Sequence, residues 1–419
     1  MSSPAPATGV PAAATATDRH TRPVRPARSF RSRLFLPLIA VCTAVTAANI
    51  YLAAPLLPLI ARDFGSTPSA VAWLASVAQF GYAAGLLFFA PLGDRVNRRR
   101  LVAVLTLAAA AALVAGAATG GTYALAGAVL VASAATVVPQ LLVPLVAERA
   151  PAHQRGRHVA AVIAGLFTGI VAARVLGALA GQAFGWRWVF LGAAGLTALL
   201  GLATSAALPR ETPRLGGPLF AGLTALPGVV RRSPELWRAC VRQAGMYGAW
   251  SAMWTTLALL LTEEDGYGMT TAAAGLFGLF GLAASVTAPL AGGLVDRFGA
   301  AKVVRTAYAG AAVSVPLFWL GGHVMAALCA AAVLVHAALV ASHVANQTLA
   351  LTTTSAPATA NTAYVVAGFA GGAVASAVAG TAFTHWGWGG VCAVAGAWLA
   401  LGWGSTAVRG RAPRRATGA

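Results

Sequence analysis

The sequence predicts an all-α membrane protein in which twelve transmembrane helices form two pseudo-symmetric six-helix bundles. Of its 419 residues, 58% are hydrophobic and 9% are charged, and the mean hydropathy is +0.75. Soluble domains carry about a quarter charged residues, so this composition is typical of a chain embedded in a lipid bilayer. Long apolar runs give the number of helices, and an internal repeat gives their grouping.

Each apolar run reaches the roughly 17 residues that a helix needs to cross a bilayer. In the first half the runs cover 34–61, 70–92, 101–119, 123–147, 158–183 and 188–208. In the second half they cover 239–261, 271–294, 303–320, 324–350, 362–384 and 388–407. We therefore expect an N-terminal bundle over residues 34–208 and a C-terminal bundle over residues 239–407.

A single offset of 202 residues relates the two halves. Asp94-Arg95 recurs as Asp296-Arg297, Gly185-Trp186 recurs as Gly387-Trp388, and Asp63 matches Asp265. Separate features that share one offset indicate a duplicated unit. Internal repeats of this size are typical of membrane transporters.

The placement of the basic residues predicts the topology. A net charge of +19 would suggest a nucleic-acid partner for a soluble protein. Here six arginines lie in residues 1–33, four follow the second span, five lie in residues 209–238 and four in residues 408–419, whereas the opposite connections carry only Arg62 and Arg187. By the positive-inside rule both termini are cytoplasmic, and the charge indicates the lipid bilayer rather than nucleic acid as the partner.

Three segments outside the bundles have compositions of their own. Residues 1–33 are rich in Ala, Pro and Thr and predict a disordered basic cytoplasmic tail against anionic lipid. A cleaved signal peptide is the rival interpretation, but the first apolar run is too long and begins too late. Residues 209–238, with five prolines, predict a cytoplasmic linker, and residues 408–419 a second basic cytoplasmic tail.

The connection after the second span carries a motif that its repeat shares. It reads Pro91-Leu-Gly-Asp94-Arg95-Val-Asn97-Arg98-Arg99-Arg100, and the repeat reads Gly292-Gly-Leu-Val-Asp296-Arg297-Phe-Gly299-Ala-Ala-Lys302. Both resemble the G-x-x-x-D-R-x-G-R-[RK] signature of the major facilitator superfamily. A lone Asp-Arg pair in a basic loop would be an ordinary topology signal, but two copies at the repeat offset favour the motif. The resemblance implies a conformational latch made of Asp94, Arg95, Arg98, Asp296 and Arg297.

The first copy departs from the signature at two positions. Ala90 replaces the leading glycine, where a small residue permits close helix contact. Asn97 replaces the turn glycine. Asn is the commonest non-glycine residue in the left-handed conformation, so we expect the turn to survive with Asn97 in that conformation.

The resemblance covers residues 34–407 and is nearest to bacterial drug, sugar and metabolite efflux permeases. It implies the major facilitator fold, a small-molecule substrate, alternating access, proton antiport as the mode of export, action as a monomer, and no cofactor. Lys302 is the single lysine among 29 basic residues, and such arginine use is typical of GC-rich bacterial genomes. We therefore expect the protein to reside in the bacterial plasma (inner) membrane.

The fifth span carries Arg174 between two pairs of glycines spaced four apart: Gly165 with Gly169, and Gly177 with Gly181. Glycines at this spacing allow a neighbouring helix to approach closely. An arginine near mid-membrane costs about 2.5–3.5 kcal/mol on insertion scales and is expected to face the bundle interior or a wet cavity. The alternative is that Arg174 only caps carbonyls of a neighbouring helix.

All ten acidic residues lie in tails, loops or span ends, so the usual intramembrane proton carrier of the family is missing. The tenth span offers His336 and His343 on one helix face, followed by Asn346 and Gln347. A histidine that titrates near neutral pH is a candidate proton carrier. The equally open alternative is that these residues bond adjacent helices.

By resemblance, spans 1, 4, 7 and 10 line a central cavity, with help from 2, 5, 8 and 11. The remaining candidates for a substrate or proton pathway are Asn49, Tyr51, Gln79, Tyr82, Gln140, Tyr247, Trp250, Trp254 and Tyr364. Tyr247, Trp250 and Trp254 share a face of the seventh span because they are three and four residues apart. An aromatic stripe can equally face lipid or serve packing.

Other functions lack their motifs. Export by proton antiport is the implied mode, and the alternative is uptake or facilitative carriage of a small polar metabolite without proton coupling. The sequence has no H-E-x-x-H, no G-x-S-x-G and no pair of buried acids for an intramembrane enzyme, and no G-x-x-x-x-G-K-[ST] loop for an ATP-driven pump. We expect no catalytic residue and no metal: Cys42, Cys240, Cys329 and Cys392 lie in or beside apolar spans without metal-binding spacing.

Overall fold

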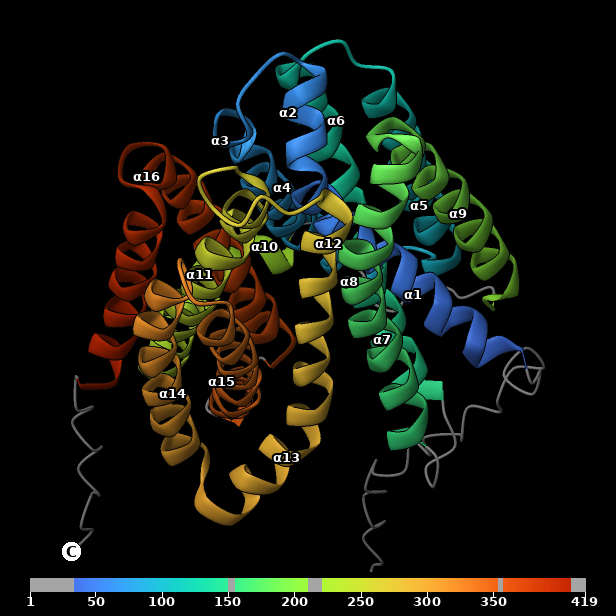
Figure 1. The fold of residues 1–419 in the computed structure, drawn as a ribbon. Coiled ribbons are helices and arrows are strands. Elements are labelled where there is room, and N and C mark those ends of the chain that lie inside the picture. Colours follow the sequence, from blue (N-terminus) through green and yellow to red (C-terminus); the bar gives the residue numbers. More distant parts are fainter. Residues whose placement is uncertain (1–33, 150–154, 210–220, 353–356, 408–419) are drawn as a thin grey trace, which may run out of the picture.

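The computed structural model describes residues 34–149, 155–209, 221–352 and 357–407 (Figure 1). Every regular element among these residues is helical. The expected tails, residues 1–33 and 408–419, lie outside the described residues.

The N-terminal half contains the elements expected from the first six apolar runs. They are α1 (Phe35–Tyr51), η2 (Ala54–Leu56), α2 (Leu57–Asp63), α3 (Pro68–Val71), α4 (Trp73–Phe89), η3 (Pro91–Asp94), α5 (Arg98–Ala117), α6 (Thr122–Ala135), α7 (Val138–Arg149), α8 (Arg155–Phe184) and α9 (Trp186–Ala207). The first span bends by 48° between α1 and the segment of η2 and α2. Pro55 and Pro58 stand at the starts of η2 and α2, where their missing N–H groups end the preceding helix.

The C-terminal half follows the second six runs. Its elements are α10 (Ala221–Arg232), α11 (Pro234–Thr262), α12 (Thr271–Gly275), η5 (Leu276–Gly281), α13 (Leu282–Phe298), α14 (Ala300–Leu320), α15 (Met325–Thr352) and α16 (Pro357–Ala407). Part of the expected linker is helical, because α10 and the first turn of α11 fall within residues 209–238. α16 covers both of the last two runs and contains one non-helical residue, Gly387.

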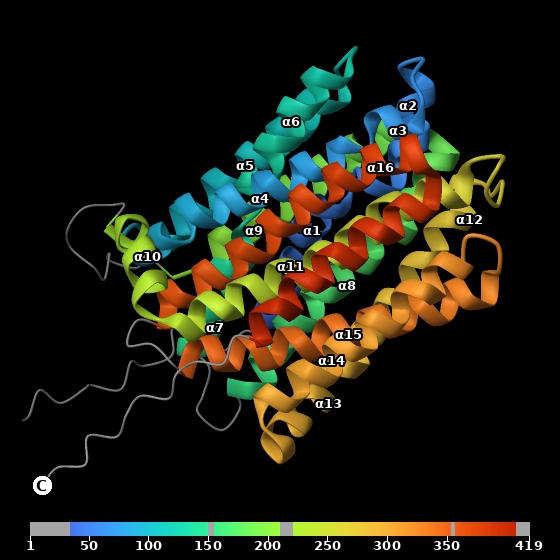
Figure 2. The same cartoon turned by 90° about the vertical axis from the view of Figure 1, so that its left-hand side faces the viewer.

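The number of crossings is consistent with twelve. Nine described helices are long and apolar enough to cross a membrane, and the bent pair of the first span makes ten. α16 counts once in this number although Figure 2 shows two antiparallel arms. α11 is 29 residues long but carries Glu235, Arg238 and Arg242 in its first part, and it supplies the remaining crossing.

The repeat is visible in the backbone. Gly185 and Gly387 both have positive φ, +90° and +60°, a conformation that glycine adopts without steric cost. In each half the tryptophan that follows is buried and fixes the turn: Trp186 donates to Asp63 Oδ2 at 3.2 Å, and Trp388 donates to the Phe318 carbonyl at 2.6 Å. The same turn is therefore built twice, 202 residues apart.

The expected conformation of Asn97 is wrong. Gly299 has φ +81°, but its counterpart Asn97 has φ −64° and ψ 109°. Asn97 instead caps α5, because its side chain accepts hydrogen bonds from the backbone N–H groups of Arg99 (3.0 Å) and Arg100 (3.4 Å). The turn survives through a helix cap rather than a left-handed residue.

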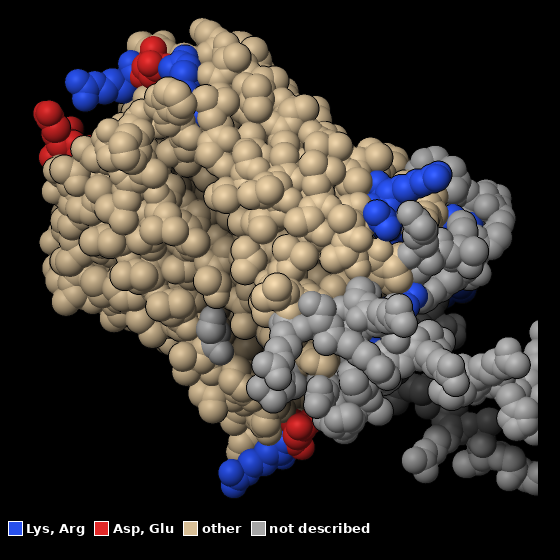
Figure 3. Space-filling view, turned by 90° about the vertical axis from the view of Figure 1, so that its right-hand side faces the viewer, with Lys and Arg blue, Asp and Glu red and all other residues tan. Residues whose placement is uncertain are grey.

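The two halves meet mainly toward one end of the molecule. α4 packs on α16, and α8 packs on α12 and η5. Figure 2 places α2, α3 and α12 at this end and α10 at the opposite end. On the face shown in Figure 3, charged side chains gather at the two ends and leave a broad uncharged band between them, as a membrane-spanning protein requires.

Candidate functional site

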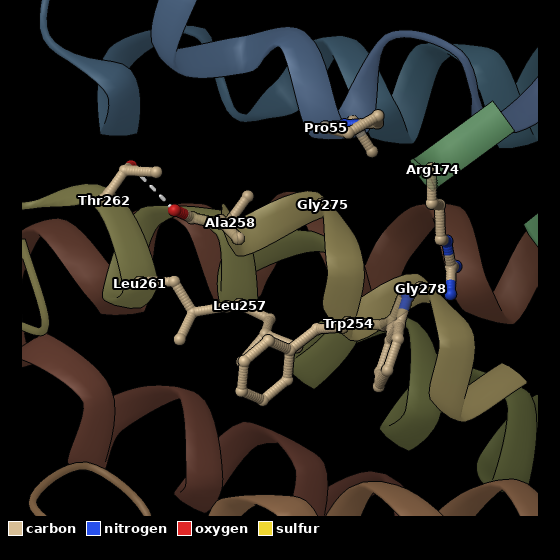
Figure 4. A pocket seen from close by; sticks show the side chains of 12 residues that line it. Pro55, Arg174, Trp254, Leu257, Ala258, Leu261, Thr262, Gly275 and Gly278 are labelled. Carbon is tan, nitrogen blue, oxygen red and sulfur yellow. Dashed lines mark hydrogen bonds between the residues drawn. The ribbon is translucent and has the colours of Figure 1, made fainter. Parts of the chain in front are cut away.

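Arg174 lies at the centre of the interface between the halves, inside an aromatic cage formed by Tyr51, Trp250 and Trp254. Its guanidinium carbon is 5.3, 5.0 and 4.7 Å from these ring centroids, within the range of cation–π contact. Tyr51 comes from α1, Arg174 from α8 and the two tryptophans from α11, so both halves build the cage. Figure 4 shows the Arg174 side chain extending from α8 beside Trp254.

His336 of α15 supports the cage from the C-terminal half. Its Nε2 accepts a hydrogen bond from Trp250 Nε1 at 3.2 Å, and its Nδ1 lies 2.7 Å from the Ala332 carbonyl. These partners fit the neutral ring with the proton on Nδ1. The His336 ring also stands edge-on to Trp254, with 4.4 Å between the centroids. His336 therefore fixes the orientation of both tryptophans.

The charge of Arg174 has no counter-charge among the described residues. Arg174 is 6% exposed, and its Nε atom is buried without a hydrogen-bond partner. No described carboxylate forms an ion pair with it. A cation–π contact contributes about 0.5–2 kcal/mol, whereas burying an ion costs several kcal/mol even after relaxation. The cage reduces this cost, and an anion beside Arg174 would reduce it further.

A polar network beside the cage joins the two halves. Gln79 of α4 donates to Ser376 of α16 at 3.0 Å and accepts from Ser251 of α11 at 2.9 Å. Ser376 also bonds Ser251 at 2.8 Å and Thr255 at 3.0 Å. All four residues are buried. Gln79 is thus a side chain of one half inserted into a serine and threonine cluster of the other.

An aromatic layer continues from the cage toward the end that carries α10. Tyr51 and Tyr247 share a hydrogen bond of 2.6 Å between their hydroxyls. The Phe369 ring packs on Tyr247 and on Tyr82, with centroid distances of 4.9 and 4.5 Å. Gln140 of α7 donates to the Tyr82 hydroxyl at 3.4 Å. Because Tyr82 and Phe369 belong to different halves, their contact joins the halves on this side of the cage.

Beyond the layer lies a cavity of about 440 Å³. It is lined by Arg95 and by residues of α4, η3, α5, α7, α10 and α16, including Gln140, Leu226, Thr359 and Asn361. We call it the α10-side cavity. Three spaces beside Arg174 are much smaller, about 90, 40 and 10 Å³. Ligand pockets usually measure about 300–1,000 Å³, so the α10-side cavity is large enough for a small molecule and the spaces beside Arg174 are not.

The other candidate pathway residues lie outside the cage. The Tyr364 hydroxyl donates to Gln243 at 2.6 Å and lies 3.4 Å from His343 Nδ1. Gln347 donates to Asn361 at 2.8 Å, and Asn346 donates to Ser342 at 3.0 Å. Asn49 donates to Thr197 of α9 at 3.0 Å, inside the N-terminal bundle and away from Arg174.

Of the expected latch residues, Arg98 has the clearest setting. It is buried, donates to the Gly93 carbonyl at 2.9 Å and forms an ion pair with Glu148 of α7 at 3.0 Å. Asp296 and Arg297 are exposed at the end of α13. The side chain of Asp94 lies outside what the structure describes. The structure therefore places the Arg98 contact within the N-terminal half.

The glycines of α8 contact α1. A Cβ atom on Gly165 or Gly169 would overlap the backbone carbonyl of Ala40 or Ala44. Gly177 and Gly181 face the side chains of Leu52 and Leu56. α8 thereby lies close enough to α1 for Arg174 and Tyr51 to meet.

Sequence reasoning missed Phe369 and the partners of Gln79, namely Ser251, Thr255 and Ser376. Serine and threonine in a helix often bond a carbonyl of the preceding turn, as Thr256 does at 2.8 Å, so their presence alone signals no site. Ser251 and Thr255 are, however, one turn apart on the face next to Trp250 and Trp254. That spacing was the available signal.

A family model described as Major Facilitator Superfamily matches residues 39–375. The chain belongs to this superfamily of secondary transporters and is an integral membrane protein that carries a small molecule. It is 80% identical over 408 residues, which are 97% of this chain and 95% of the relative, to "Probable transporter SCO4007" of Streptomyces coelicolor.

Two more distant proteins are also similar. The chloramphenicol resistance protein of Streptomyces lividans is 31% identical over 269 residues, which are 63% of this chain and 67% of that protein. The crystal structure of the nucleoside transporter NupG has a TM-score of 0.71 at 11% identity and covers 89% of this chain and 98% of that chain. This last likeness shows the fold.

Proposed function

We propose that the protein exports a small molecule from a bacterial cell by proton antiport, as a monomer in the plasma membrane. The observation that carries this proposal is the difference between the two sides of the interface: the α10-side cavity measures about 440 Å³, whereas Gln79 and its partners join the halves beside the much smaller spaces around Arg174. Under the topology expected from the basic residues, the open side faces the cytoplasm. The substrate would enter there and reach Arg174 after the layer of Tyr82 and Phe369 separates.

Similarity supports export as the direction. The relative from Streptomyces lividans is named for chloramphenicol resistance, and removal of a toxic compound requires outward transport. A cytoplasm-facing cavity is the loading state of such a cycle. The alternative is uptake or facilitative carriage without proton coupling. It uses the same cytoplasm-facing state and a state open on the opposite side, and the gradient of the substrate alone drives it.

His336 and His343 are the proposed proton carriers. In the described state both ring nitrogens of His336 take part in hydrogen bonds. A proton on Nε2 would break the hydrogen bond that Nε2 accepts from Trp250 Nε1–H, and it would add a second positive charge beside Arg174. Protonation would therefore loosen the cage. His343 contacts Tyr364 near the α10-side cavity and can relay a proton toward it.

Everted membrane vesicles with an acid interior test the coupling. An acridine dye reports the pH gradient while chloramphenicol and a panel of amphipathic compounds are added one at a time. A coupled substrate should release protons and restore the dye signal with wild-type protein.

Two variants extend this assay. Asp94→Asn should insert normally but cycle slowly, and His336→Gln should carry substrate without proton movement. Flux that is unchanged after the gradient is collapsed would establish an uncoupled carrier and reject antiport.

A further inference from the structure

We infer that the transported substrate is an organic anion: its carboxylate, sulfonate or phosphate group pairs with Arg174, and its apolar body packs against Trp250 and Trp254. This inference rests on the proposed function, since it names the substrate class of the same site. Arginine keeps its proton at neutral pH, so the cage holds a permanent positive charge.

The missing counter-charge is the first argument. By sequence, all ten acidic residues fall in expected tails, loops or span ends, and those described form no ion pair with Arg174. Its Nε atom, buried and without a partner, can donate to an incoming oxygen. Guanidinium groups bind carboxylate and phosphate through two parallel hydrogen bonds. An anion would thus neutralise the positive charge of Arg174 and accept a hydrogen bond from its Nε.

The second argument is a comparison within the chain. Arg187 also lies over an aromatic ring, 4.5 Å from the centroid of Trp186, but it forms an ion pair with Asp63 and is partly exposed. Arg187 thus has its counter-charge in the protein, whereas Arg174 lies among aromatic rings and forms no ion pair with a described carboxylate. This difference points to a ligand as the partner of Arg174.

The residues that line the adjoining spaces indicate the chemical character of the rest of the substrate. Beside Arg174 they are bounded mainly by apolar side chains, including Phe167, Ile170, Val171, Leu339 and Val340. Such walls favour an apolar or aromatic body. An organic cation would be repelled by Arg174, and a neutral compound would leave the charge uncompensated.

Binding to three matched compounds tests the inference: phenylbutyrate, phenylbutanol and phenylbutylamine, which share one body and differ in charge. Quenching of tryptophan fluorescence in purified, lipid-reconstituted protein gives the affinities at a fixed chloride concentration. We expect the anion to bind at least about tenfold tighter than the alcohol, because a charge-assisted bidentate pair forms only with the anion. The amine should bind weakest.

Three variants assign the preference to Arg174. Arg174→Gln should make the anion and the alcohol bind alike, and Arg174→Lys should keep part of the difference. Arg187→Gln is the matched control, since it also removes an arginine next to a tryptophan, and it should keep the full preference. Equal wild-type affinities for the anion and the alcohol, or a preference that survives Arg174→Gln, would overturn the inference.

Thermal stability separates a ligand-binding role from a packing role. Arg174→Met removes an uncompensated buried charge, so without ligand its Tm should equal or exceed that of the wild type, and phenylbutyrate should raise the Tm of the wild type alone. A lower Tm in this variant with no anion effect in either protein would show that Arg174 only supports packing. Anion binding without gradient-driven flux would reject proton antiport and leave the anionic substrate class standing. Proton-coupled flux of all three compounds would support antiport and reject the anionic substrate class.

Discussion

Gln79 is the residue by which the N-terminal half enters the polar cluster of the C-terminal half. Replacing it with Leu removes the hydrogen bonds to Ser376 and Ser251, and these two serines remain hydrogen-bonded to each other. Each hydrogen bond contributes about 1 kcal/mol net. Losing two should therefore move the equilibrium about thirtyfold toward the state that is open on the opposite side from the α10-side cavity.

Spin labels at Ala70 of α3 and Thr384 of α16, both exposed, can report this shift for Gln79→Leu. The longer-distance population between the two labels should grow. Thr256→Val is the control, because Thr256 bonds only carbonyls of its own helix. An unchanged distance distribution for Gln79→Leu would show that Gln79 does not hold the halves together.

Glu263 ends α11 in a turn with Glu264 and Asp265. Partial burial, and then the nearby charge of Asp265, raise the pKa of Glu263. The negative end of the helix dipole acts in the same direction. Because the folded-state pKa lies above the unfolded value, ionised Glu263 is disfavoured in the folded protein at neutral pH, and this penalty disappears as pH falls below the usual glutamate pKa of about 4.3.

Glu263→Gln should therefore raise the Tm at pH 7, and the gain should shrink toward pH 4 in a thermal-unfolding series. Glu264→Gln is the control from the same exposed turn and should change the Tm less. A gain that is equal at both pH values would assign the effect of Glu263→Gln to something other than ionisation.

At the scale of elements, the contact of α8 with α1 depends on Gly165 and Gly169. Gly169→Ala places a Cβ against the Ala44 carbonyl, which can move only with its helix. We expect a loss of about 1–3 kcal/mol, typical of overpacking, and a lower Tm. Gly195→Ala on α9 is the matched control, because open space surrounds that position. A Tm of Gly169→Ala equal to that of this control would exclude a close contact.

The sequence predicted these elements well because a membrane helix needs a long apolar run, and most of these helices have one. It predicted less where the backbone breaks. The bend of the first span and the helix α10 inside the expected linker both depend on local turn chemistry and tertiary contacts. Asn97 shows the limit most clearly, since the same residue type suits a left-handed turn and a helix cap, and only the surrounding chain selects the cap.

At the scale of the whole molecule, the sequence named most members of the candidate site without showing that they meet. The spacing of Tyr247, Trp250 and Trp254 predicted a shared face, but not that this face is buried against Arg174. Arg174 and Tyr51 come from different helices, and only the packing of α8 on α1 brings them together. A site formed between two halves depends on how the halves dock, which local pattern does not encode.

The orientation and resting state of the molecule lead to the last prediction, which uses single cysteines in a Cys329→Ala background, because the other three native cysteines are buried. Thr359→Cys, in the α10-side cavity, should react with a membrane-impermeant maleimide in everted vesicles and not in intact cells. Ala70→Cys, exposed on α3, should show the opposite pattern. Adding Gln79→Leu should slow labelling at Thr359→Cys, because the cavity closes as the opposite side opens. Labelling of Thr359→Cys from outside the cell would invert the topology, and with it the proposed direction of loading.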